Sequence, residues 1–215
     1  MRAFLSLEGG EAIENKEALL ELYDEGVRLI ALSWNYKNKI CAGVLEQDES
    51  LGVTDFGKEI ISLMNNLGII IDVSHLNDKS FWDVLALSKK PVIASHSNAR
   101  AVCSNRRNLS DEQFLAIKRS GGVVGINFYP DFLRNDGNAS IEDIIKHIEH
   151  FLALGGEDFL SIGADFDGVS YLPQNIRGAE DMYMLFEEML KCGYKEDVIK
   201  KISYTNMERF LKENL

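Results

Sequence analysis

The feature of this 215-residue sequence that most restricts its fold is a regular alternation of short apolar runs with longer amphipathic segments. Each apolar run is a near-continuous stretch of Val, Ile or Leu, which is typical of strands covered on both faces. Strands that alternate with helices in this way form βαβ units and a parallel sheet. The predicted strands cover residues 3–7, 28–33, 68–74, 91–95, 122–127 and 159–163.

The segments between the predicted strands carry helix signals at their ends. Thr54 can cap a helix over residues 55–67, and Gly68 is a residue type that ends one. Ser110 and Gln113 have the spacing of a capping box, which predicts that a helix begins there. The other predicted helices cover residues 16–25, 140–153, 179–191 and 196–214.

The number of strand–helix units limits the architecture. A closed barrel of eight units takes about 250 residues, or roughly 31 per unit, so a chain of this length holds about seven. Only six strands are recognisable in the sequence. We therefore expect an α/β fold of the (β/α)8 TIM-barrel type that is incomplete, with six of the eight units. Because no low-complexity linker divides the chain, we expect one domain over residues 1–215.

Composition excludes several classes of partner. The chain has 34 acidic and 23 basic residues, and a net charge of -11 repels nucleic acid and anionic lipid. No apolar run approaches the roughly 20 residues of a membrane span, and the apolar stretch at the N-terminus is too brief for a signal peptide. Cys41, Cys103 and Cys192 are odd in number and widely spaced, as expected of free thiols in a reducing compartment. We expect a cytoplasmic protein with neither nucleic acid nor membrane as a partner.

Polar side chains follow the predicted strands at their carboxyl ends, where parallel α/β folds bind ligands. Two histidines, a glutamate and an aspartate together are the ligand set of Zn²⁺ or a similar ion. Such an ion lowers the pKa of bound water towards ~7, and a carboxylate nearby can manage the proton of that water. The alternative is that these residues make ordinary loop hydrogen bonds. This interpretation is the weaker one, because all four residues are expected at the same rim of the sheet. The strand-end residues are Glu8, Trp34, Asn35, His75, His96, Asn127 and Asp165.

Three further features receive separate interpretations. His147 and His150 could share a metal on one helix face, but charges surround that helix, so we predict a solvated surface for both. The glycine pair at 9–10 lacks the spacing of a phosphate loop and predicts a close backbone approach. The arginine pair at 106–107 could bind a substrate carboxylate through bidentate hydrogen bonds if it lies beside a metal cluster.

Five ordered motifs of the sequence resemble the signatures of the membrane (renal) dipeptidase family. They are EGG at 8–10, IDVSH at 71–75, VIASHS at 92–97, SNRRN at 104–108 and GADFDGV at 163–169. The resemblance covers essentially the whole chain. It implies a metal-dependent (β/α)8 barrel related to amidohydrolases, which hydrolyses dipeptides with two zinc ions.

The resemblance also implies roles for individual residues. Glu8 resembles the carboxylate that bridges the two metal ions, and His75 and His96 resemble ligands of the second ion. Arg107 is similar to the arginine that binds the C-terminal carboxylate of the substrate. Asp165 is similar to the acid that orients the attacking water and carries its proton. The expected substrate is therefore a dipeptide.

Two departures from the family pattern matter. The family also has a His-x-Asp pair on its first strand, and this chain begins only seven residues before Glu8. We therefore expect the pair to be absent with the first two strand–helix units, which leaves Glu8 and Asp165 for the first metal and predicts one retained ion or none. Trp34 stands where the mammalian-type enzyme has a substrate-binding histidine. It could stack on the substrate or only fill the rim.

An incomplete barrel predicts open sheet edges beside residues 3–7 and 159–163, and exposed edges pair with other chains. We therefore expect a homo-oligomer or a partner that covers these edges. Three functions remain compatible with the sequence. The first is a zinc-dependent dipeptidase, the second is a catalytically inactive truncated homologue, and the third is a small-peptide-binding module. The motifs favour the dipeptidase.

Overall fold

The computed structural model describes residues 4–215 of the chain. The chain forms two compact units, the first built mainly from the chain up to Ala94 and the second mainly from Ser95 to Phe210. Each unit contains parallel strands and the helices that follow them. The single domain expected for residues 1–215 stays a prediction.

The first unit contains a parallel sheet with the strand order β1-β2-β3-β4. Because the strands run in one direction, their carboxyl ends share one edge of the sheet, where Glu8 is opposite Ala31 and Ala31 is opposite Asp72. The order follows the sequence, as in successive βαβ units. The strands are β1 (Leu5–Glu8), β2 (Val27–Ala31), β3 (Ile70–Asp72) and β4 (Val92–Ile93).

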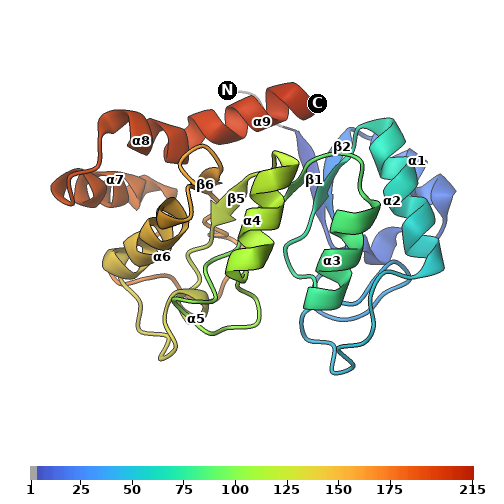
Figure 1. The fold of residues 1–215 in the computed structure, drawn as a ribbon, viewed down its shortest axis with the longest axis horizontal. Coiled ribbons are helices and arrows are strands. Elements are labelled where there is room, and N and C mark those ends of the chain that lie inside the picture. The colour runs from blue at the N-terminus through green and yellow to red at the C-terminus, as the bar shows by residue number, and fades with distance from the viewer. Residues whose placement is uncertain (1–3) are drawn as a thin grey trace. The chain divides into compact units, whose positions relative to one another are not determined.

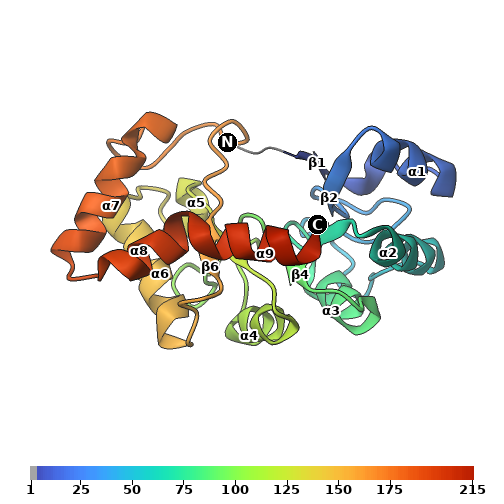
Figure 2. The ribbon, with the colours of Figure 1, turned by 90° about the horizontal axis from the view of Figure 1, so that it is seen from above.

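Three α-helices accompany this sheet, and α2 lies between α1 and α3 (Figures 1 and 2). They are α1 (Lys16–Asp24), α2 (Asp55–Leu67) and α3 (Asp78–Leu87), and a short 3-10 turn, η1 (Gly10–Ala12), follows β1. The hydroxyl of Thr54 accepts a hydrogen bond from the N–H of Gly57 (2.9 Å), and Gly68 ends α2 at φ 74°, as predicted. The sequence analysis assigns no helix to α3, whose short buried face of Ser80, Phe81 and Val84 gives a weak periodic signal.

The second unit contains the parallel strand pair β5 (Val124–Ile126) and β6 (Leu160–Ile162) (Figure 1). The capping box at its first helix is present, because Ser110 and Gln113 exchange hydrogen bonds of 2.8 and 3.2 Å. No helix in residues 4–215 has the length and apolar character needed to cross a membrane. The helices are α4 (Asp111–Ser120), α5 (Pro130–Leu133), α6 (Ile141–Ala153), η2 (Ala179–Asp181), α7 (Met182–Lys191), α8 (Glu196–Lys200), the π-helical η3 (Lys201–Thr205) and α9 (Asn206–Asn214).

All six predicted strands are present, and each strand after β1 is shorter than its apolar run. The first begins at Leu5, and Ala3 lies outside the described residues. The other runs lose their last residues because the backbone leaves the ladder and turns into a loop. After β3, for example, the Val73 N–H still donates to the carbonyl of Ile93 (2.8 Å), whereas His75 has turned to φ 68°. The apolar pattern thus locates the strands, and the turns that follow carry the polar residues.

Candidate active site

Glu8 and His75 meet at the carboxyl edge of the sheet in the first unit. Glu8 is the last residue of β1, and His75 follows the end of β3. The Oε1 atom of Glu8 lies 3.0 Å from the Nε2 atom of His75, and the histidine side chain is only 9% exposed. A carboxylate and an imidazole are two of the three donor types that zinc uses in proteins. The pair therefore offers the beginning of a metal site.

The orientation of the His75 ring is fixed by a hydrogen bond of its other nitrogen, Nδ1. Its Nδ1 atom lies 3.1 Å from the carbonyl oxygen Oδ1 of Asn35. Because Oδ1 can only accept, Nδ1 carries the hydrogen, and in the neutral imidazole Nε2 then presents its lone pair towards Glu8. A lone pair that faces a carboxylate is electrostatically favourable only when a cation or a proton lies between them. The donor set therefore fits a divalent metal ion.

His96 belongs to the second unit, where the backbone around it packs closely on two glycines. The N–H of Ser97 donates to the carbonyl of Gly125 (2.7 Å). A Cβ atom at Gly125 or Gly163 would lie 2.0 or 1.9 Å from the carbonyl oxygen of Ser95. Only glycine therefore permits this approach of the segment to β5 and β6. The Nδ1 atom of the buried His96 lies 2.7 Å from the Ser95 hydroxyl oxygen.

Within residues 4–215, one group of His, Cys, Asp or Glu residues has the composition and spacing of a possible metal site. It consists of Glu8, His75 and His96. Two imidazoles with one carboxylate are the protein ligands of several catalytic zinc sites, which keep a further position for water or substrate. These are the three residues that the sequence analysis nominates as metal ligands.

Asp165 follows β6 and adopts φ 62°, a left-handed conformation that is uncommon for an aspartate. The side-chain amide of Asn127 donates a hydrogen bond to its Oδ2 atom (3.2 Å). The non-glycine residues with positive φ in the described chain are His75, Asp165 and Asn175. Strained backbone conformations of this kind cluster at functional sites, and two of these three residues are predicted site residues.

The two arginines of the 106–107 pair differ in their surroundings. Arg106 is exposed, whereas Arg107 is only 7% exposed. The guanidinium of Arg107 lies over the ring of Phe132, 5.5 Å from its centroid. Its terminal nitrogens lie 3.5 Å from the hydroxyl of Ser97 and 3.4 Å from the carbonyl of His96. A buried guanidinium beside the His96 segment is a suitable anchor for a carboxylate.

Trp34 is the most exposed of the predicted site residues, with 54% of its surface accessible. Its ring centroid lies 6.3 Å from that of His75, and the two rings are tilted by 33°. An indole this exposed does not fill a closed space. It offers an apolar face next to the candidate metal ligand.

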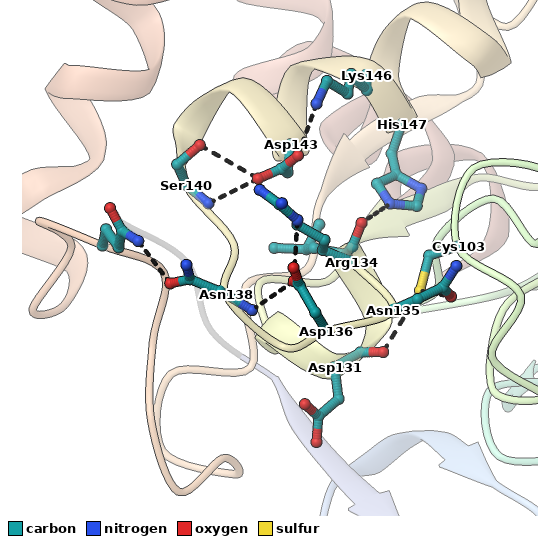
Figure 3. Close-up of polar contacts among 12 residues, drawn as sticks. Cys103, Asp131, Arg134, Asn135, Asp136, Asn138, Ser140, Asp143, Lys146 and His147 are labelled. Carbon is teal, nitrogen blue, oxygen red and sulfur yellow. Dashed lines mark hydrogen bonds and ion pairs between the residues drawn. The ribbon is translucent and has the colours of Figure 1, made fainter.

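The prediction of a solvated surface for His147 is wrong. His147 is fully buried on α6, where Nδ1 accepts from the N–H of Ala99 and Nε2 donates to the carbonyl of Leu133, both at 3.0 Å. Figure 3 shows the contact of His147 with this carbonyl oxygen. Burial lowers its pKa to about 4. The charges of α6 occupy only part of its circumference, and the buried part also carries Ile144 and Phe151. His150 is partly exposed and lies 2.7 Å from an Asp111 oxygen.

Three asparagines have structural roles that sequence reasoning does not assign. Asn35 orients His75, and Asn127 contacts Asp165. Asn135 accepts from the N–H of Ser104 (3.1 Å) and so holds the turn that precedes Arg107. The sequence signal for the first two is their position after strands, since Asn127 directly follows β5 and Asn35 lies in the loop after β2.

The glycine pair at 9–10 marks a close approach, as predicted. A Cβ atom on Gly10 would lie 2.5 Å from the carbonyl oxygen of Leu32. Because that oxygen belongs to the backbone, it cannot rotate away from a side chain. The chain therefore needs glycine at this position to pass next to the end of β2.

The chain matches a protein-family model over nearly its whole length. The model of the membrane dipeptidase family (peptidase family M19) matches residues 1–214. An uncharacterized protein of Klebsiella pneumoniae is 38% identical over 221 residues, which cover 99% of this chain and 81% of that protein. An uncharacterized dipeptidase of Schizosaccharomyces pombe is 36% identical over 83% of this chain and 44% of its own length.

Two solved structures are similar over almost the whole chain. A metallopeptidase from Rhodobacter sphaeroides, liganded with a phosphinate mimic of the dipeptide L-Ala-D-Ala, has a TM-score of 0.92 and 34% identity over 99% of this chain. A structure described as the metallopeptidase dipeptidase AC has a TM-score of 0.91 and 34% identity over 98% of this chain. The chain spans 63% of the length of each. These likenesses confirm the predicted α/β fold of the TIM-barrel type, present in part.

Proposed function

Since the chain belongs to the membrane dipeptidase family, we propose that it is a metal-dependent dipeptidase, which hydrolyses the peptide bond of a dipeptide with water. The observation that carries the proposal is the 3.0 Å separation of Glu8 Oε1 and His75 Nε2 at the carboxyl edge of the sheet. Further support comes from the dipeptide mimic bound to the similar Rhodobacter sphaeroides structure. L-Ala-D-Ala is accordingly the first substrate to test.

The proposed metal ligands are Glu8, His75 and His96, and the proposed ion is zinc. A bound divalent ion would polarise the scissile carbonyl and make water more acidic. The hydrogen bond from His75 to Asn35 supports a ligand role, because it leaves Nε2 as a lone-pair donor. Two imidazoles with a carboxylate suit zinc, although Co²⁺ and Mn²⁺ accept the same donors.

Asp165 is the proposed catalytic carboxylate. It would hold the attacking water, accept a proton from it and pass that proton to the leaving amine. The half-buried position of Asp165 supports this role, because a carboxylate needs both access to the substrate and a fixed orientation. The hydrogen bond from Asn127 supplies an orientation without a second charge.

Arg107 and Trp34 are the proposed substrate-binding residues. The planar guanidinium of Arg107 can bind the C-terminal carboxylate of a dipeptide with two parallel hydrogen bonds. Its burial against Phe132 strengthens that interaction by excluding water. Trp34 would stack on a substrate side chain, since it is exposed beside His75.

The proposal includes a partner chain, a second copy or another protein, that pairs with β1. In the four-stranded sheet β1 is a terminal strand, and Leu5 on it is 56% exposed. An exposed terminal strand favours pairing with a second copy or another chain. Light scattering that gives a monomer at high concentration would contradict self-association.

The proposed cytoplasmic location rests on the cysteines. Cys41, Cys103 and Cys192 are all free thiols, which suits a reducing compartment.

The test is hydrolysis of L-Ala-D-Ala by the purified chain with added Zn²⁺, compared with three variants. His75→Asn and Asp165→Ala should each lower kcat/KM by at least about 100-fold, since they remove a metal ligand and the proton carrier. Arg107→Ala should mainly raise KM, by about 10-fold or more, because it removes a charged contact to bound substrate. His150→Asn is the matched control, because His150 lies on α6 and pairs with Asp111.

The possible outcomes separate the functions that the sequence leaves open. Turnover that survives in His75→Asn and Asp165→Ala would contradict the proposed catalytic roles. Binding of L-Ala-D-Ala without turnover would instead indicate a peptide-binding module. A folded chain that neither binds nor hydrolyses the dipeptide would indicate an inactive homologue.

A further inference from the structure

Asn127 has a single allowed orientation at the end of β5. It is fully buried, and its side-chain nitrogen donates to Oδ2 of Asp165 (3.2 Å). Its Oδ1 atom accepts from the backbone N–H of Tyr129 (2.5 Å). Rotation of the amide by 180° would direct its NH2 group at the Tyr129 N–H and an oxygen at the Asp165 carboxylate. Both contacts would then be repulsive, so the donor faces Asp165.

The backbone of Asn127 is held as firmly as its side chain. The Asn127 N–H donates to Oδ1 of Asn98, and the Asn98 amide nitrogen donates to the Asn127 carbonyl, both at 3.0 Å. Asn98 is fully buried and lies two residues after His96. The next residue, Ala99, donates its N–H to the buried His147. A continuous series of hydrogen bonds therefore connects the His96 segment with Asp165.

The other oxygen of Asp165 is confined by Gly168. A Cβ atom at position 168 would lie 2.1 Å from Oδ1 of Asp165 and 3.0 Å from Cγ. Gly168 is not among the glycines with positive φ, so its backbone conformation is open to other residues. A side chain at position 168 would therefore occupy the space in which the Asp165 carboxylate lies.

We propose that Asn127 and Gly168 are positioning residues that fix the carboxylate of Asp165 for catalysis, an inference that rests on the proposed function of Asp165. The amide donates one hydrogen bond to one oxygen, and the glycine leaves room for the other. A neutral donor suits this purpose, because a lysine or arginine would stabilise the carboxylate charge and weaken it as a proton acceptor. Misplacement of a catalytic group by about 1 Å can cost roughly 100-fold in rate.

The kinetic test compares Asn127→Ala, Gly168→Ala and Asp165→Ala in L-Ala-D-Ala hydrolysis with Zn²⁺. Asn127→Ala and Gly168→Ala should each lower kcat by about 10- to 100-fold and change KM by less than about 3-fold. In the Asp165→Ala background, Asn127→Ala should lower the residual rate no further, because both changes act through one carboxylate. An unchanged kcat in Asn127→Ala, or the same loss in both backgrounds, would overturn the proposal.

The control is the same substitution at another buried, hydrogen-bonded asparagine, which disturbs the structure to a similar extent. Asn206 is also buried, and its amide donates to the carbonyls of Glu157 and Leu160, both at 2.8 Å. Asn206→Ala should lower stability but leave kcat per folded molecule unchanged. Conversely, a loss of kcat in Asn206→Ala equal to that in Asn127→Ala would show that the effect is merely structural and would overturn the proposal.

A second readout needs no activity and no metal. In the NMR spectrum of the metal-free chain, the side-chain amide signals of Asn127 should shift in Asp165→Ala, and their hydrogens should exchange faster with water. Signals that stay unchanged would overturn the contact between these residues. If Asp165→Ala shifts the signals but the wild-type chain hydrolyses no dipeptide, the proposed function fails while the contact stands, so the two failures are distinguishable.

Discussion

The side-chain oxygen Oδ1 of Asn35 lies 3.1 Å from Nδ1 of His75, on the opposite side of the imidazole from Glu8. The neutral amide therefore sets the tautomer of the histidine and its direction at once. A histidine held in this way approaches a metal ion with little loss of side-chain freedom. Asn35 thus contributes to the site from behind the proposed ligand.

Removal of this hydrogen bond should weaken metal binding. We predict that Asn35→Ala lowers the affinity for Zn²⁺ by about 10- to 100-fold, the usual effect of losing the partner behind a histidine ligand. Titration of the metal-free chain with Zn²⁺ against a competing chelator measures the change. Asn65→Ala is the control, because Asn65 lies on α2 and hydrogen-bonds to Ser88 and Lys89. Equal Zn²⁺ affinity in wild type and Asn35→Ala would contradict the role.

The burial of His147 predicts a dependence of stability on pH. Burial lowers the pKa of this histidine from 6.5 to about 4, so the folded chain holds it neutral while the unfolded chain protonates it below pH 6.5. Its contribution to stability is therefore complete above pH 6.5 and is lost as the pH falls towards 4. The loss amounts to about 3 kcal/mol. Urea unfolding of wild type and His147→Gln at pH 7 and pH 4 measures it.

The Gln variant should be less stable at pH 7 but should lose about 3 kcal/mol less than wild type between pH 7 and pH 4. The difference arises because an amide does not titrate, whereas the other titratable groups are common to both proteins. Two parallel pH profiles would show that protonation of His147 does not limit the acid stability of the fold.

Local patterns predict the elements of the fold that depend on a few neighbouring residues. Thr54 and Gly68 mark the ends of α2, and Ser110 with Gln113 marks the start of α4. These signals are local because caps and left-handed glycines act on the backbone within three or four residues. The apolar runs locate the strands for a similar reason, since β2 to β6 are buried almost throughout and only β1 is largely exposed among the described strands.

Contacts between distant segments cannot be predicted in the same way. The charged sequence neighbours of His147 suggest a surface position, but the residues that bury it and bond to it, Ala99 and Leu133, are 48 and 14 positions away. The weak signal of α3 has a related cause, because few of its residues are buried. The position of the site residues after strands is enough to nominate them, whereas which of their hydrogen bonds form depends on the loops.

The packing of Ser95 against two glycines predicts a specific sensitivity to small substitutions. In Gly163→Ala, the new methyl would lie 1.9 Å from the Ser95 carbonyl oxygen, a backbone atom that cannot rotate away. We expect a loss of about 1–3 kcal/mol in the free energy of unfolding, as for other overpacked cores. We also expect weaker Zn²⁺ binding, because the shift of Ser95 moves its neighbour His96.

Gly68→Ala separates backbone strain from displacement of Ser95. Gly68 adopts φ 74°, and no atom lies within 4 Å of the position that a methyl group would take there. The variant should lose about 1 kcal/mol from backbone strain alone and should keep wild-type Zn²⁺ affinity. A Gly163→Ala chain with wild-type stability and Zn²⁺ affinity would contradict the tight packing of Ser95.

The three cysteines differ sharply in access to solvent, which predicts their order of reaction. Cys192 is exposed, whereas Cys41 and Cys103 are buried, and burial raises the pKa of both buried thiols. Because the thiolate is the reactive form, a disulfide reagent should modify one thiol rapidly in the folded chain and all three in guanidinium. Cys192→Ser should abolish the rapid phase. A rapid phase that persists in this variant would mean that the segment around Cys41 or Cys103 opens readily in the native protein.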